Sequence, residues 1–155
     1  MSRHGEIRLP FGAEERVFRL GIRQWEAIEA KCDAGPPELL GRLRPLVNAL
    51  QMKLGLRQIM ASNLMGTWRI HDVREPILQG LIGGGMGSTE AGVLVRAMFD
   101  ERLSLEFAPT AYLILEAAWF GPEDDPPGES MATSGATPTT KPGRRSRAER
   151  PASPT

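Results

Sequence analysis

The apolar residues of this chain stop abruptly at Gly121, and this boundary limits where a core can form. The 35 residues from Gly121 to Thr155 hold seven of the 13 prolines, no aromatic residue and one large apolar side chain, Met131. Ordering a residue costs roughly 1–2 kcal/mol of conformational entropy, which such a segment cannot offset by burial. We therefore predict a folded domain over residues 1–122 and a disordered tail rich in Pro, Ser, Thr and Arg over residues 123–155.

The first residues alternate between polar and apolar side chains, which is the pattern of a β-strand. Residues 6–11 and 16–20 form two such runs, separated by the polar residues 12–15. Together they predict a β-hairpin, and Pro10 assigns its strand to an edge because proline has no N–H to donate. A lone hairpin is marginally stable in water, so it must pack on other elements.

From Gly21 onward the apolar residues recur every three or four positions, the spacing of amphipathic helices. We expect Pro45 to lie in the first turn of a helix and Gly55 to bend a helix. Residues 68–71 should form an extended link, and Asp72 should be the N-cap of the helix that follows. The predicted fold class is α+β and mostly helical. It consists of an N-terminal β-hairpin packed on a small bundle of about five helices, followed by the disordered C-terminal tail.

Charge and cysteine content restrict the class of function. Lys plus Arg and Asp plus Glu both number 19, so the net charge is zero and no global field draws the chain to DNA or to an anionic membrane. The one cysteine, Cys32, cannot form an internal disulfide. The opening residues contain no apolar signal core, and no uncharged run is apolar enough to span a bilayer. We expect a soluble, cytoplasmic protein with no membrane contact.

Residues suited to catalysis or metal binding are scarce. His4 and His71 each stand alone, and no Cys and His have metal-ligand spacing. The glycine-rich residues 83–88 precede a helix and could hold an anion, but no Lys-Ser or Lys-Thr follows and no strand precedes them. A tight turn between helices explains the glycines better. We expect no catalytic, cofactor-binding or metal-binding site, no small-molecule substrate, and hence no enzyme.

The basic cluster in residues 141–150 could contact nucleic acid. It contains five Lys or Arg residues and no interleaved aromatic side chain, so a solubilising role is favoured over nucleic-acid binding. DNA binding through this cluster is therefore kept only as a weak hypothesis.

Three stretches carry a more specific pattern. Residues 73–86 read Val-Arg-Glu-Pro-Ile-Leu-Gln-Gly-Leu-Ile-Gly-Gly-Gly-Met, Glu90-Ala91 follows, and residues 111–123 read Ala-Tyr-Leu-Ile-Leu-Glu-Ala-Ala-Trp-Phe-Gly-Pro-Glu. With Gly5-Glu6, the hairpin and Trp25-Glu26-Ala27-Ile28-Glu29, this pattern resembles the gene transfer agent family of phage tail assembly chaperones. That family is also described as phage tail tube proteins of gene transfer agents. The likeness covers residues 5–123.

The resemblance implies a non-enzymatic role in building phage-like tails. Such chaperones escort the long helical tape measure protein until tail tube subunits polymerise around it. The implied partners are therefore the tape measure protein and the tail tube protein. The alternative is a structural role, as a tail tube or connector component that stays in the finished particle. The sequence leaves open whether the chain also forms a homo-oligomer.

The segment from Glu38 to Met65 is the candidate partner-binding surface. Its leucine and methionine content exceeds what one buried stripe needs, and flexible thioether side chains suit surfaces that accept varied apolar partners. Core packing is the competing explanation for each methionine. We expect a groove built from these helices and the hairpin edge, lined by Leu46, Leu50, Met52, Leu56, Ile59, Met60 and Leu64.

Overall fold

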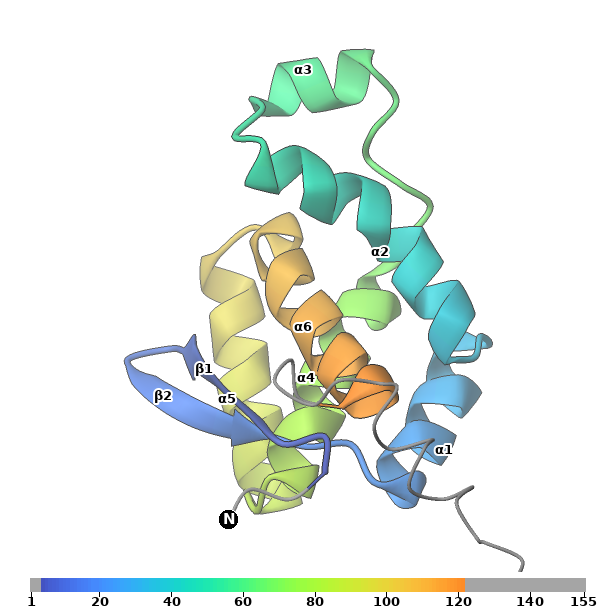
Figure 1. Ribbon diagram of the computed structural model, residues 1–155. Coiled ribbons are helices and arrows are strands. Elements are labelled where there is room, and N and C mark those ends of the chain that lie inside the picture. The colour runs from blue at the N-terminus through green and yellow to red at the C-terminus, as the bar shows by residue number, and fades with distance from the viewer. Residues whose placement is uncertain (1–3, 122–155) are drawn as a thin grey trace, which may run out of the picture. The chain divides into compact units, whose positions relative to one another are not determined.

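The computed structural model describes residues 4–121 of the 155-residue chain (Figure 1). The elements are strands β1 (Ile7–Phe11) and β2 (Glu14–Phe18), helices α1 (Ile22–Cys32), α2 (Pro36–Gln51), α3 (Leu56–Ala61), α4 (Ile70–Gly83) and α5 (Ser88–Glu101), a 3₁₀ turn η1 (Ser104–Phe107), and helix α6 (Ala108–Phe120). The predicted fold, mostly helical with an N-terminal hairpin, is confirmed. The predicted tail, residues 123–155, lies outside the described residues. Within residues 4–121, no helix combines the length and the apolar content needed to cross a membrane.

The two strands pair antiparallel across a two-residue turn. Phe11 lies opposite Glu14, and the turn consists of Gly12, with a φ of 78°, and Ala13. The second strand therefore begins two residues earlier than the alternation predicts. Phe11 and Phe18 are buried and meet edge to face, with ring centroids 6.2 Å apart. The hairpin thus turns an aromatic side toward the helices.

Helix α4 lies at the centre of the fold and contacts α1, α5, α6 and β2. Its glycines let the strand approach closely. A Cβ on Gly84 would overlap the carbonyl oxygen of Val17 in β2. A Cβ on Gly83 would likewise overlap the carbonyl oxygen of Arg19. The N–H of Arg19 donates a 3.0 Å hydrogen bond to the carbonyl of Gly80. Helix and strand therefore meet backbone to backbone.

The same glycines end the helix, as the sequence predicts for a turn between helices. Gly85 has a φ of 115°, which L side chains rarely adopt. The N–H of Met86 then donates to the carbonyl of Leu81 at 3.0 Å, a common closure of helix C-termini. The run of glycines thus serves both close packing on β2 and the turn into α5.

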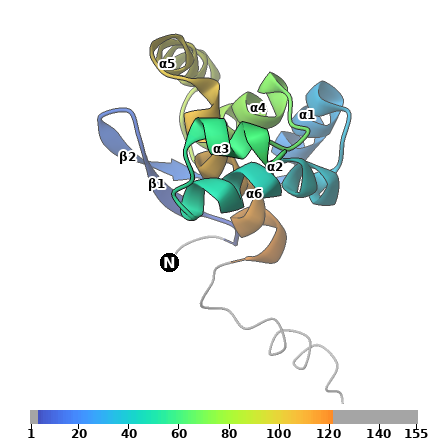
Figure 2. The same ribbon diagram turned by 90° about the horizontal axis from the view of Figure 1, so that it is seen from above.

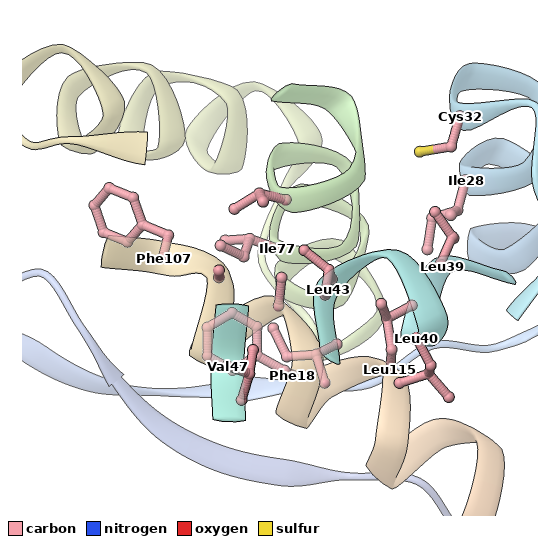
Figure 3. Close-up of a cluster of buried hydrophobic side chains, with 14 of the residues drawn as sticks. Phe18, Ile28, Cys32, Leu39, Leu40, Leu43, Val47, Ile77, Phe107 and Leu115 are labelled. Carbon is pink, nitrogen blue, oxygen red and sulfur yellow. The ribbon is translucent and has the colours of Figure 1, made fainter. Parts of the chain in front are cut away.

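The core combines side chains from the hairpin and from α1, α2, α4 and α6 (Figure 3). Phe18 of β2, Leu43 of α2, Ile77 of α4 and Leu115 of α6 have no more than a trace of exposed surface. Burial of a side chain of this size contributes roughly 1.5–3 kcal/mol. Because both ends of the described chain supply such residues, neither end can be removed without opening the core.

A buried ion pair fixes the opposite end of α4. Asp72 is fully buried and accepts hydrogen bonds from Nη1 of Arg42 in α2, at 3.0 and 3.1 Å, and from the N–H of Arg69, at 2.8 Å. Arg69 also donates from Nη2 to the carbonyl of Cys32, the last residue of α1, at 2.7 Å. Burial alone would lower the pKa of Arg42, but the charge of Asp72 and a hydrogen bond to Glu38 raise it overall. Since a buried carboxylate requires partners, Asp72 ties α1 and α2 to the start of α4.

Two expectations about helix starts are wrong. Pro45 lies inside α2 and does not begin a helix. The break in hydrogen bonding costs about 3 kcal/mol, which is outweighed because the apolar face, including Leu43 and Leu46, is buried on both sides of Pro45. Asp72 is the third residue of α4, and Arg69 is the N-cap. The extended link is therefore two residues shorter than predicted, although the Asp72 carboxylate still caps the helix through the Arg69 N–H.

Replacing Gly84 by alanine tests the contact between α4 and β2. The new Cβ overlaps the Val17 carbonyl, so we expect the free energy of unfolding, measured in urea, to fall by about 1–3 kcal/mol. Gly92→Ala is the matched control, because nothing lies within 4 Å of its Cβ position and alanine favours a helix interior by about 1 kcal/mol. Equal effects of the two substitutions would show that the contact contributes nothing.

Replacing Arg42 by methionine tests the buried ion pair. The carboxylate of Asp72 would stay buried without its cation, so we expect the free energy of unfolding to fall by about 3 kcal/mol. Arg23→Met, at an exposed position on α1, is the control and should change it by about 0.5 kcal/mol or less. An Arg42→Met protein as stable as this control would contradict the role given to Asp72.

Candidate protein-binding surface

Residues 52–67 form a projection that we call the α3 lobe. Figure 1 shows α3 beyond the end of α2, on the side of the molecule away from the N-terminus. Within the lobe only Ile59 is buried. Met52 and Met60 are each 68% exposed and Leu56 is 43% exposed. Exposed apolar side chains that lie close together, as Leu56 and Met60 do on α3, are typical of surfaces that contact another protein.

Two residues in the left-handed conformation shape the lobe. Lys53 (φ 58°) follows the end of α2, and Asn63 (φ 56°) follows the end of α3. After each, the next N–H donates to the carbonyl five residues earlier, at 3.2 and 2.9 Å respectively. The bend predicted at Gly55 is a complete break, with Gly55 as the N-cap of α3. The chain therefore leaves α2 at residue 52 and does not continue one long apolar stripe.

The lobe is anchored at its base. Ile59 is fully buried, and a Cβ on Gly66 would overlap the carbonyl oxygen of Arg42 in α2. Trp68 donates from Nε1 to the carbonyl of Met65 at 3.0 Å and closes the loop that leads back to α4. Figure 2, which views the molecule from above, shows α3 over α2. The base is thus fixed while the outer side chains stay in water.

The seven residues predicted to line a groove fall into three groups. Leu46 and Ile59 are fully buried, Leu50 and Leu64 are half-buried, and Met52, Leu56 and Met60 are exposed. Leu56 and Met60 share one side of α3 because they are four residues apart. The two buried residues belong to the hydrophobic core. Contact with a partner through the three exposed residues stays a prediction.

The hairpin edge is not brought to the lobe as predicted. Strand β2 is fixed at the C-terminal end of α4 by the glycines, and the main helix contacts of the hairpin are with α4 and α6. A cleft of about 600 Å³ lies elsewhere, along α5, and is lined by Arg74, Val93 and Arg96 among others. That cleft mixes charged and small side chains, whereas the exposed side chains of the lobe are large and apolar. The lobe is the better candidate for an apolar partner.

Basic residues, and no acidic ones, occur between Glu38 and Asp72, the stretch of chain that contains the α3 lobe. Four of them are exposed: Arg44, Lys53, Arg57 and Arg69. Arg44 donates from Nε to the hydroxyl of Tyr112 at 3.2 Å, and this hydrogen bond raises the pKa of Arg44. Reasoning from the net charge of the whole chain missed this feature. The signal for it is local, because no acidic residue lies between Glu38 and Asp72.

Among residues 4–121, no three His, Cys, Asp or Glu side chains gather closely enough to hold a metal ion. The Cys32 thiol donates to the carbonyl of His71 at 3.3 Å. Burial and, second, the charge of Asp72 raise the pKa of Cys32 to about 12. The thiol is therefore protonated at neutral pH and is a poor nucleophile.

A comparison with protein families matches residues 4–121 to the family described as phage tail tube protein, GTA-gp10. The match takes in the hairpin, the α3 lobe and helices α1 to α6. The chain belongs to this phage tail family. The resemblance seen in residues 73–86 and 111–123 is thereby confirmed, and the matched region ends next to the predicted tail. No match was found among curated proteins or among solved structures.

Proposed function

We propose that this phage tail family member is a non-enzymatic tail assembly chaperone that binds the tape measure protein during tail morphogenesis. It keeps that protein in solution in the cytoplasm until tail tube subunits polymerise around it. The observation that carries the proposal is the α3 lobe, where Met52, Leu56 and Met60 are exposed. Membership of a phage tail family supports a role among other tail components.

An apolar lobe with a fixed base suits the escort of a long helix. A helix with an exposed apolar stripe aggregates unless another surface covers that stripe. Methionine side chains are unbranched and flexible, so Met52 and Met60 can adapt to apolar side chains of different size. Because Ile59 and Gly66 already hold the lobe, binding has to order only its outer side chains.

The proposal includes no chemical step. Cys32 is buried and protonated, and His4 and His71 belong to different parts of the fold. Binding alone, without a cofactor, a metal ion or a small-molecule substrate, accounts for the features described.

A structural role is the second candidate, and the family's description as a tail tube protein favours it. A tube or connector subunit stays in the finished particle, where the α3 lobe would contact a neighbouring subunit. Mass spectrometry of purified particles separates the two candidates. A chaperone is absent from the particles or present in traces, whereas a subunit is present in many copies.

Replacing Met52 and Met60 together by aspartate tests the lobe as the contact surface. The parent protein should keep an otherwise insoluble tape measure fragment in solution on co-expression. The double variant should lose about half or more of this effect, because each carboxylate would be desolvated in the contact. The soluble fragment is measured after centrifugation at about 0.3 M NaCl, where interactions between exposed charges are strongly screened.

The matched control carries Ile22→Asp and Val93→Asp. These positions are 73% and 66% exposed and lie on α1 and α5, so the control adds the same charge outside the lobe. It should solubilise the fragment as well as the parent does. Far-UV circular dichroism confirms that each variant is folded. A folded Met52→Asp/Met60→Asp protein that matches the parent would exclude the lobe as the contact surface.

A further inference from the structure

The charges of the folded domain are unevenly distributed. Residues 39–71 contain five Lys or Arg residues and no acidic residue, whereas the remainder of residues 4–121 contains fourteen acidic and eight basic residues. The acid-free segment includes the whole α3 lobe. The exposed methionines therefore lie in a stretch of chain with a net positive charge, whereas the remainder of residues 4–121 is net negative.

Four of the five bases keep their charge available to a partner. Arg42 is neutralised by Asp72 and Glu38, at 3.0 and 2.8 Å. The exposed bases Arg44 and Arg69 donate to uncharged oxygens, those of Tyr112 and Cys32. Within residues 4–121, the structure gives no carboxylate within ion-pair distance of Arg44, Lys53, Arg57 or Arg69.

Two of these free charges, those of Lys53 and Arg57, belong to the α3 lobe itself. Lys53 follows Met52 in the chain, and Arg57 precedes Met60 by three positions on α3, which places the two on neighbouring parts of the helix surface. Charges that flank an apolar seam in this way select the partner in helix pairing, because like charges repel and opposite charges attract. The arrangement therefore fits an apolar stripe with negative borders.

We infer that the segment recognised by the α3 lobe is an amphipathic helix whose apolar stripe is flanked by acidic residues. This inference rests on the proposed function and specifies the chemistry of the bound segment. Nucleic acid fits less well, because single strands are bound by stacking of their bases on aromatic side chains, and a duplex is held chiefly through its phosphates, which would leave the exposed methionines without a partner. The lobe has no exposed aromatic residue, and the neighbouring Trp68 is half-buried with its Nε1–H bonded to Met65.

Binding of three designed peptides to the full-length protein tests the inference. The peptides, of about 20 residues each, share one leucine stripe and carry Glu, Gln or Lys beside it. Fluorescence anisotropy at about 0.1 M NaCl gives the dissociation constants. The Glu-flanked peptide should bind about 10-fold more tightly than the Lys-flanked one, because attraction by Lys53 and Arg57 in the first case and repulsion in the second each contribute a small factor. The difference should shrink at about 1 M NaCl.

Reversal of the lobe charges supplies the decisive variant. Lys53→Glu/Arg57→Glu should invert the preference, so that the Lys-flanked peptide binds most tightly. Arg23→Glu/Arg96→Glu is the matched control, because it changes the net charge equally at exposed positions on α1 and α5. The control should keep the preference of the parent. An unchanged preference in the lobe variant would overturn the inference.

The remaining outcomes separate this inference from the proposed function. Equal affinity for the three peptides, lost in Met52→Asp/Met60→Asp, overturns the charge preference and leaves apolar docking on the lobe intact. Peptide binding that neither lobe variant alters overturns both. Tighter binding of a short DNA duplex than of the Glu-flanked peptide, lost in Lys53→Glu/Arg57→Glu, overturns the inference in favour of nucleic acid.

Discussion

The packing of α4 against β2 is the constraint on which the rest of the structure depends. Gly80, Gly83 and Gly84 leave one side of α4 without side chains, and the backbone and Phe ring of β2 occupy that side. The other sides of α4 contact α1, α5 and α6. At the start of the same helix, the buried carboxylate of Asp72 holds Arg42 of α2. One helix thus contacts α1, α5, α6 and β2 directly, and its Asp72 also holds α2, which packs mainly on α6 and carries the α3 lobe.

The apolar side chains of α2 and of the α3 lobe differ in burial, and the change comes at the end of α2. Before residue 52 the apolar side chains of α2 enter the core, whereas those of Met52, Leu56 and Met60 remain exposed. The lobe contributes one fully buried side chain, Ile59, to the fold. Substitutions on its outer surface should therefore change binding more than the free energy of unfolding. This separation is what allows the lobe to be tested by mutation without unfolding the domain.

Periodicity in the sequence is sufficient to predict the hairpin and the order of the helices, because each of these elements buries one face. It fails at Pro45, where tertiary burial outweighs a local rule about proline. It also fails to tell which of the seven candidate site residues are buried, because α2 ends at Gln51 and Lys53 then turns the chain in a left-handed conformation that lysine rarely adopts. The sequence does contain the basic character of the lobe, because no acidic residue lies between Glu38 and Asp72. The net charge of the whole chain, which is zero, hides this feature, and a count of charges over the segment shows it.

Hydrogen–deuterium exchange tests most directly whether the α3 lobe is the surface that meets the partner. Amide exchange is compared between the free protein and its complex with a tape measure fragment. Much of the lobe lies in turns and a short helix near the surface, where exchange is fast in the absence of a partner. If the lobe binds the partner, exchange slows chiefly over residues 52–67 and stays unchanged in α1. Slower exchange confined to α5 and the hairpin, with residues 52–67 unaffected, would contradict this role of the lobe.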